Sequence, residues 1–183
     1  TNVIGINNSA FGHYALYANT TSNNSGFGYK ALRFNTTGAY NVAVGSSALV
    51  SNTIGIRNNA LGVNALLSNT TGNNNNAFGY YALRNNTTGS NNSAFGYSAL
   101  VNNTTSNNSA FGYRSLFNNT IGTVNSAFGK DSLYNNTTGT ANSAFGFQSL
   151  TSNTIGTNNS AFGNYALKYN TTGSGNTSVG RAA

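Results

Sequence analysis

The chain has 183 residues, of which 5% are charged, and its formal net charge at pH 7 is +7. It has no Cys, one His and one acidic side chain, which excludes disulfides and thiolate metal sites. His13 and Asp131 lie seven repeat units apart, so they cannot act together as a general base or as metal ligands. We therefore expect no enzymatic activity, no catalytic residue, no metal site and no cofactor.

One sequence unit of about 17 residues repeats along the chain. The glycine of its Ala-Phe-Gly triplet recurs every 16 or 17 residues, which marks eleven units. A fixed period this short is typical of a solenoid, in which each unit forms one coil. We predict an all-β fold, a parallel β-solenoid (β-roll) of eleven coils, as a single repeat array over residues 1–183. The marker glycines are Gly12, Gly28, Gly45, Gly62, Gly79, Gly96, Gly112, Gly129, Gly146, Gly163 and Gly180.

The elements of one unit can be followed over residues 91–112. Asn, Gly, Thr and Ser are poor helix formers, and two short extended segments are expected, at residues 93–97 and 99–102. Asn-Thr-Thr-Gly and the Asn pair after it form turns, because Gly and Asn tolerate positive φ. Two units are one residue shorter. We expect the turns at Thr20–Asn24 and Thr104–Asn108 to absorb this difference, since a slip within a strand exchanges its two faces.

Two columns of equivalent positions are apolar in every unit and are expected to form the core ladder of the coils. With parallel coils about 4.8 Å apart, these columns would extend over roughly 50 Å. The first column is Phe11, Phe27, Val44, Leu61, Phe78, Phe95, Phe111, Phe128, Phe145, Phe162 and Val179. The second is Leu16, Leu32, Leu49, Leu66, Leu83, Leu100, Leu116, Leu133, Leu150 and Leu167.

Small residues flank the Phe column, with Ala before it in nine units and Gly after it in all eleven. Alternate residues of a strand share a face, so the face opposite Phe carries very small side chains. Such a face lets another backbone approach closely. Two interpretations stay open: the other wall of the same coil packs there, or a sister chain does. The candidate chain–chain interface residues are Ala10, Gly12, Ala94, Gly96, Ala110 and Gly112.

The polar residues also follow the repeat. The chain contains 37 Asn, and stacked Asn side chains form amide ladders along the coil axis. The eight Lys and Arg residues fall at several different offsets of the unit. Nucleic-acid binding needs clustered bases, so we expect no nucleic-acid partner. No apolar run reaches transmembrane length, so we expect no membrane span.

The unit resembles known repeats. Residues 92–100, Asn-Ser-Ala-Phe-Gly-Tyr-Ser-Ala-Leu, resemble the head repeats of trimeric autotransporter adhesins. The longer form with Asn-Thr-Thr-Gly at residues 86–89 is similar to repeats of bacterial and phage tail-fibre-like proteins. The resemblance implies a left-handed β-roll, three chains around one axis, and an extracellular location or one at a cell or virion surface. The bulky Phe and the long unit depart from the adhesin pattern.

Uniform units favour a structural role, because a binding site usually interrupts a repeat. We predict a structural subunit of an extracellular homomeric fibre or filament, whose partners are copies of the same chain. These copies would form a trimer, or would stack end to end through array ends that carry no capping sequence; otherwise the array is a segment of a longer chain.

Two other functions are compatible with the sequence, and both involve binding at the surface of the array. The alternative is an adhesin or tail-fibre segment that binds a cell-surface glycan or receptor. Its support is a set of tyrosines expected to be exposed, since sugars stack on such rings. A third interpretation is ice binding through the Thr column that contains Thr36 and Thr53. The tyrosines are Tyr14, Tyr17, Tyr29, Tyr80, Tyr81, Tyr97, Tyr113, Tyr134 and Tyr165.

Overall fold

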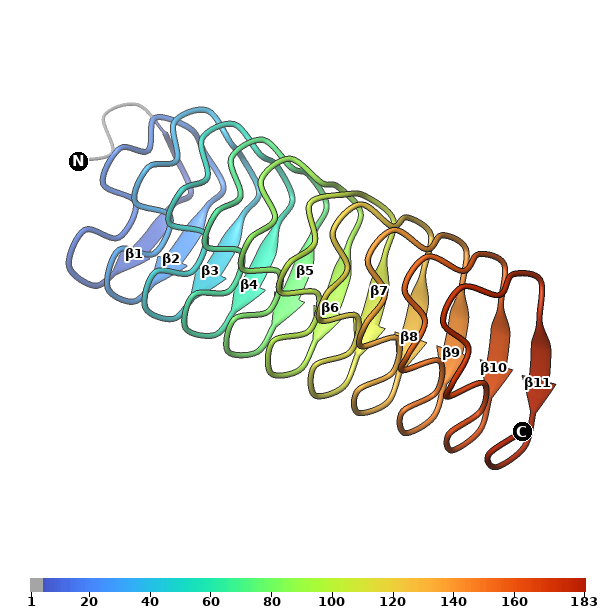
Figure 1. The fold of residues 1–183 in the computed structure, drawn as a ribbon. Helices are drawn as coiled ribbons and strands as arrows, with labels where there is room; N and C mark the ends of the chain where they lie inside the picture. Colours follow the sequence, from blue (N-terminus) through green and yellow to red (C-terminus); the bar gives the residue numbers. More distant parts are fainter. Residues whose placement is uncertain (1–4) are drawn as a thin grey trace.

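The computed structural model describes residues 5–183, and the expected start of the array at residues 1–2 lies outside them. This part of the chain is all-β, with eleven three-residue strands and no helix. Each strand pairs in parallel with its sequence neighbours, so all eleven form one sheet along one wall of a rod (Figure 1). The predicted parallel β-solenoid is confirmed. The strands are β1 (Ser9–Phe11), β2 (Ser25–Phe27), β3 (Val42–Val44), β4 (Asn59–Leu61), β5 (Asn76–Phe78), β6 (Ser93–Phe95), β7 (Ser109–Phe111), β8 (Ser126–Phe128), β9 (Ser143–Phe145), β10 (Ser160–Phe162) and β11 (Thr177–Val179).

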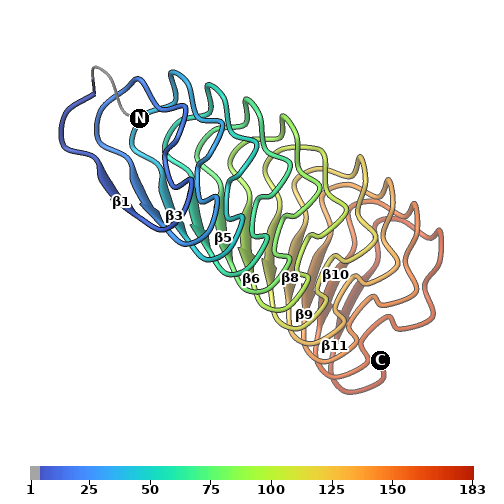
Figure 2. The same cartoon turned by 90° about the vertical axis from the view of Figure 1, so that its left-hand side faces the viewer.

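After each strand the chain turns sharply and returns through irregular segments that also stack from coil to coil (Figure 2). Backbone hydrogen bonds close two successive turns, from the Ala99 amide to the Gly96 carbonyl and from the Asn103 amide to the Leu100 carbonyl. The predicted second extended segment, residues 99–102, is therefore wrong. Its Leu100 has a φ of 52°, in the left-handed region, and the equivalent leucines share this conformation.

The interior of a coil is narrow. In the coil of β6, five fully buried side chains converge from around the coil: those of Asn92, Ala94, Ala99, Leu100 and Asn103. The Leu column is buried from Leu16 to Leu150, with Leu167 partly buried, so the prediction for this half of the core ladder is confirmed. Burying one leucine contributes roughly 1.5–3 kcal/mol. This exceeds the roughly 1–2 kcal/mol that a left-handed conformation costs.

The Phe column does not line this interior, so that half of the predicted core ladder is wrong. Along each strand the Ala side chain points inward and the Phe side chain points outward, and Ala94 is fully buried while Phe95 is only partly buried. A lumen filled by two Ala, one Leu and two Asn side chains has no space for a phenyl ring. The partly buried members are Val44, Phe78, Phe95, Phe111, Phe128 and Phe145, and the exposed ones are Phe11, Phe27, Leu61, Phe162 and Val179.

The candidate chain–chain interface of Ala10, Gly12, Ala94, Gly96, Ala110 and Gly112 is also corrected, because this face belongs to the coil itself. Ala94 and Ala110 are fully buried within one chain. Gly96 has a φ of 139°, and a Cβ built on it would lie 2.7 Å from the Gly112 carbonyl carbon of the next coil. Only Ala10 and Gly12, on the first coil, are exposed. The small residues are thus explained by the opposite wall of the coil and by close stacking of glycine on glycine.

The two short units keep the strand register, as predicted. Phe11 pairs with Phe27, and Phe95 pairs with Phe111. In a 17-residue unit the side-chain Nδ2 of Asn35 donates to the Gly38 carbonyl three residues later. In the short units this acceptor is two residues away, as in the bond from Asn19 to Thr21. The missing residue is therefore absorbed in the turn.

The predicted amide ladders are present and are buried. In one column, Asn69 Nδ2 donates to Asn52 Oδ1 of the preceding coil at 2.8 Å and to the Gly72 carbonyl at 3.1 Å. In the second column, the backbone N–H of Asn92 and its side-chain Nδ2 both donate to Asn75 Oδ1, at 3.0 and 3.1 Å. Buried amides are tolerated because they are hydrogen-bonded.

Candidate functional site

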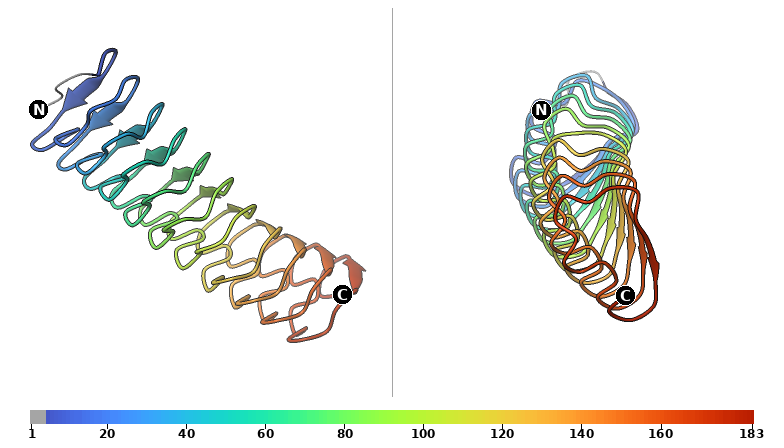
Figure 3. Two further views of the ribbon diagram at one scale, coloured as in Figure 1. Left: turned by 90° about the horizontal axis from the view of Figure 1, so that it is seen from above. Right: turned by 45° about the vertical axis from the view of Figure 1, so that its right-hand side comes forward.

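The outer surface of the sheet carries a continuous aromatic ladder. From Phe78 to Phe162 the rings stack on one another with centroids 4.6–5.0 Å apart and ring planes within 10° of parallel. They lie on the same face as the side chains of the first strand position, which are Ser, Asn or Thr in every strand except β3, where this residue is Val42. The strands turn progressively along the rod, so the ladder follows a twisted sheet (Figure 3).

We call this surface, formed by the three residues of every strand and the glycine after it, the sheet face. None of these positions carries a charged residue in any of the eleven coils. Phe27 and Phe162 are each 42% exposed, and Leu61 is 47% exposed. Monomeric proteins rarely expose a continuous apolar stripe of this length, and such stripes mark interaction surfaces.

A second surface lies immediately after the strands, and we call it the basic aromatic face. It comprises the residues one, two, five and six positions after each marker glycine. Seven of the eight bases lie on it, so the offsets that look scattered in the sequence converge in the fold. All but one of the cation–π contacts of residues 5–183 involve these bases. The seven are Lys30, Arg33, Arg84, Arg114, Lys130, Lys168 and Arg181.

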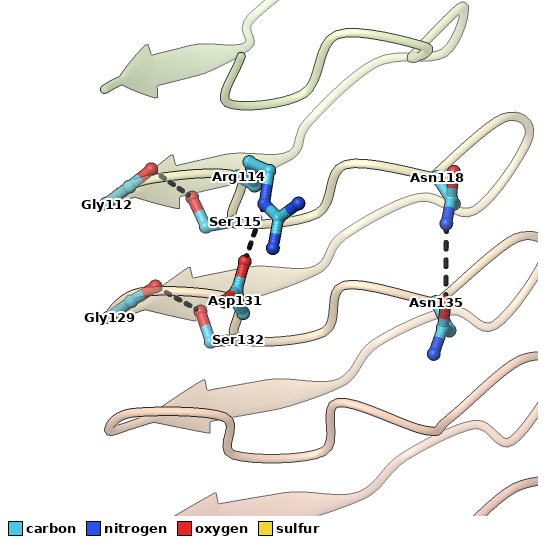
Figure 4. Close-up of polar contacts among 8 residues, drawn as sticks. All are labelled: Gly112, Arg114, Ser115, Asn118, Gly129, Asp131, Ser132 and Asn135. Carbon is cyan, nitrogen blue, oxygen red and sulfur yellow. Dashed lines mark hydrogen bonds and ion pairs between the residues drawn. The ribbon is translucent and has the colours of Figure 1, made fainter. Parts of the chain in front are cut away.

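One ion pair links two coils of this face. Arg114 Nε donates to Asp131 Oδ1 at 2.9 Å, and the aspartate side chain is only 7% exposed (Figure 4). This hydrogen bond raises the pKa of Arg114 above its ordinary value. Because Asp131 is the single acidic residue of the chain, every other base on this face lacks a side-chain carboxylate partner.

The tyrosines of this face cover one another. Tyr97 stacks between Tyr80 and Tyr113, with centroids 5.4 and 5.2 Å away. Arg84 lies over the ring of Tyr81 at 4.8 Å. A side-chain hydrogen bond with Tyr81 raises the pKa of Tyr80 above its ordinary value. Neighbouring rings and cations cover part of the ring faces, but six of the nine tyrosines expected to be exposed are 38–52% exposed, and the other three are partly buried. The exposed ones are Tyr14, Tyr17, Tyr29, Tyr80, Tyr97 and Tyr113.

A groove of about 390 Å³ crosses the coils of β5, β6 and β7 on the basic aromatic face. Its floor is Ser98 and Val101, which are 3% and 6% exposed. The same columns carry Tyr81 and Arg84 in the coil before and Arg114 in the coil after. With Phe117, which lies beside Arg114 in the coil after, two small residues stand between four larger neighbours and create the depression, with an arginine at each end. We call it the β5–β7 groove.

Residues with conventional chemistry are not brought together. His13 packs against Tyr14 and Tyr29, far along the rod from Asp131. Over residues 5–183 no group of three or more His, Cys, Asp or Glu side chains is placed to hold a metal ion. Within the same range no helix is long and apolar enough to cross a membrane. In the Thr column that suggested ice binding, the Thr36 and Thr53 hydroxyls donate to backbone carbonyls of the next coil. Their hydrogens are therefore not free to donate to ice.

No family model matches the chain, and no curated protein or solved structure matches it. The resemblance to adhesin heads and tail-fibre repeats therefore stays a prediction that depends on the repeat motif.

Proposed function

We propose that the chain is a structural subunit of an extracellular homomeric fibre, and that its copies associate side by side through the sheet face. The observation that carries this proposal is the uncharged sheet face along one wall of the rod, with its aromatic ladder unbroken from Phe78 to Phe162. A rod with regular coils and no inserted loop is suited to a structural role. Extracellular placement is supported by the resemblance of the unit to surface adhesins and tail fibres.

A second copy is the occupant that this face fits best. Each chain carries a net charge of +7, so two chains repel one another overall, and this repulsion is weakest when the contact surface itself carries no charge. The sheet face meets this condition along its whole length. Two copies can therefore bring their ladders together without burying an unpaired cation, whereas the basic aromatic faces repel each other.

The size of the face supports the same occupant. Eleven strands about 4.8 Å apart, each with its glycine making four residues of about 3.4 Å, define a surface of roughly 700 Å². Stable interfaces bury about 800 Å² on each partner. The side chains at the rim would supply the remaining area when the two faces are aligned along their length.

The test replaces Phe95 and Phe128 with Lys. In a single chain both new side chains reach water, so the coil should still fold, but at a sheet-to-sheet interface they bury two charges. We expect sedimentation velocity to show assemblies of the unmodified protein and monomers of this variant, with circular dichroism showing that it remains folded.

The matched control places two lysines at Asn74 and Asn91, which are exposed and share a column with Arg57. It adds the same charge away from the sheet face and should assemble like the unmodified protein. Monomeric unmodified protein, or normal assembly of the Phe95 and Phe128 variant, would contradict the proposal. The mass of the assembly also distinguishes a pair of chains from the trimer that the resemblance implies.

An adhesin or tail-fibre segment that binds a surface glycan remains the second candidate function. Six of the tyrosines are exposed, but stacking between neighbouring rings reduces the ring surface that is open to a sugar. The feature that favours this candidate is the β5–β7 groove, whose chemistry is that of hydrogen bonds and positive charge.

A further inference from the structure

We propose that the β5–β7 groove binds an anionic polysaccharide that carries one carboxylate in each disaccharide. This inference uses the basic aromatic face and does not depend on association through the sheet face. It starts from the two arginines, Arg84 and Arg114, that stand at opposite ends of the groove in alternate coils.

The two arginines are placed to receive carboxylates. Arg84 lies over Tyr81 and faces no side-chain carboxylate of the chain; its Nε is buried, so its terminal Nη atoms are the groups that can meet a ligand. Arg114 is held over the rings of Tyr113 and Tyr134, at 5.0 and 4.8 Å, and uses its Nε to bind Asp131. Guanidinium groups that are fixed in this way bind carboxylates with directional, charge-assisted hydrogen bonds.

The spacing fits an extended sugar chain that runs along the rod. Arg84 and Arg114 stand in neighbouring columns two coils apart, and their separation along the rod is on the order of 10 Å at about 4.8 Å per coil. This is comparable with the length of a disaccharide, so successive carboxylates of an alternating polymer would meet the two arginines in turn. Between them, the Ser98 and Val101 floor leaves space for the neutral sugar, and the Asn85 and Asn102 amides border it.

Nucleic acid fits the same groove less well. Single-stranded nucleic acid gains much of its affinity when bases stack on open aromatic faces. Here the rings of Tyr80, Tyr97 and Tyr113 stack on one another, and Arg84 covers Tyr81. Tyr97 and Tyr113 line the groove and are 46% and 43% exposed, but their stacking on one another leaves less ring face for a base than an isolated ring would offer, which favours a charged sugar.

The probe is a fluorescent hexasaccharide of alternating glucuronate and N-acetylglucosamine, with an uncharged N-acetylglucosamine hexamer and an oligothymidine for comparison. We expect the glucuronate probe to bind most tightly. Arg84→Leu, which installs the residue found at Leu67 in the same column, should weaken binding about tenfold or more. Val101→Phe, which installs the residue found at Phe117 in that column, should fill the groove and weaken binding without changing charge.

Net charge is controlled separately. The pair Arg114→Gln with Asp131→Ser removes one arginine and its buried partner together, so the net charge stays +7, and it should weaken binding. Arg57→Asn removes a charge on another face and should not. Equal weakening by Arg57→Asn, normal binding by folded Val101→Phe, or tighter binding of the uncharged hexamer or oligothymidine would overturn the proposal. None of these variants touches the sheet face, so assembly and sugar binding can fail independently.

Discussion

The buried Asn side chains are the residues on which each coil most depends. A 17-residue coil encloses too little apolar volume for a conventional core, and its two Asn columns take the place of larger hydrophobic residues. Asn69 uses both ends of its amide: Nδ2 donates to Asn52 and Gly72, while Oδ1 accepts from Asn86 at 3.0 Å. A buried polar group left without such partners costs about 1–3 kcal/mol.

Asn69→Asp tests this role through its pH dependence. One carboxyl oxygen still accepts from Asn86, but the other faces two acceptors, so the folded state favours the protonated acid and its pKa rises. Below about pH 3.9 the acid is protonated in both states, and the loss of stability is smallest. As the pH rises above that value, the loss should grow by about 1.4 kcal/mol for each pH unit until the folded-state pKa is reached. Chemical denaturation of the variant and the unmodified protein across this pH range measures the loss of unfolding free energy.

Asn91 provides the matched control for this experiment. Its amide also bridges two coils, accepting from Asn74 and donating to Asn107, but its side chain is exposed. Water can solvate a carboxylate there, so Asn91→Asp should lose little stability at any pH. A loss for Asn69→Asp that does not change with pH would contradict the explanation.

At the level of elements, the turn that closes each coil determines whether the Asn ladder continues. In the 17-residue units, each Asn of the Asn69 column donates to the equivalent Asn of the preceding coil. The short turn at Thr104–Asn108 interrupts this pattern, because Asn103 Nδ2 donates to the Thr105 carbonyl alone. The buried Asn86 Oδ1 is consequently left without a hydrogen-bond partner.

Inserting a glycine between Thr105 and Ser106 restores the 17-residue turn. We expect Asn103 to reach Asn86 and the free energy of unfolding to rise by about 1 kcal/mol, since one additional turn residue costs little loop entropy. Thermal and denaturant unfolding would measure the gain. The same insertion between Thr88 and Gly89 makes an 18-residue unit and should destabilise the rod. An equal effect of both insertions would show that turn length does not control the ladder.

The elements also show what the sequence could and could not predict. The period predicts the stacked coils, the register and the Leu column, because each depends on spacing alone. The alternation in Ser-Ala-Phe places Ala94 and Phe95 on opposite faces but does not say which face is inside. That depends on the width of the coil, which is set by the turns at Gly96 and Leu100. A useful signal is side-chain size: the Ala94 column contains only Ala, Gly and Ser, whereas the Phe95 column varies among Phe, Leu and Val, as a surface allows.

The candidate surfaces were harder to predict for the same reason. Bases at different offsets, such as Arg84 and Arg114, share a face only because the chain reverses direction twice within a few residues of the marker glycine. The β5–β7 groove arises from two small residues, Ser98 and Val101, in columns whose neighbours are large. A single unit contains neither feature; both appear when the coils are stacked.

At the level of the whole molecule, the charge distribution separates the two surfaces. The sheet face carries no charge, while the basic aromatic face carries seven of the eight bases. Dissolved salt screens charges over about 10 Å at 0.1 M and over about 3 Å at 1 M. Association through the sheet face is opposed by repulsion between chains of net charge +7, whereas binding of an acidic sugar is favoured by attraction. The two proposed interactions should therefore respond to salt in opposite directions.

We predict that raising the NaCl concentration strengthens assembly and weakens binding of the glucuronate hexasaccharide by the same protein. Sedimentation velocity measures the first response and fluorescence anisotropy the second, both on the unmodified chain. The variant with lysines at Phe95 and Phe128 is the control, because it should stay monomeric at every salt concentration and still bind the sugar. Assembly that weakens as salt rises would mean that ionic contacts hold the copies together. The uncharged ladder would then not be the surface at which they meet.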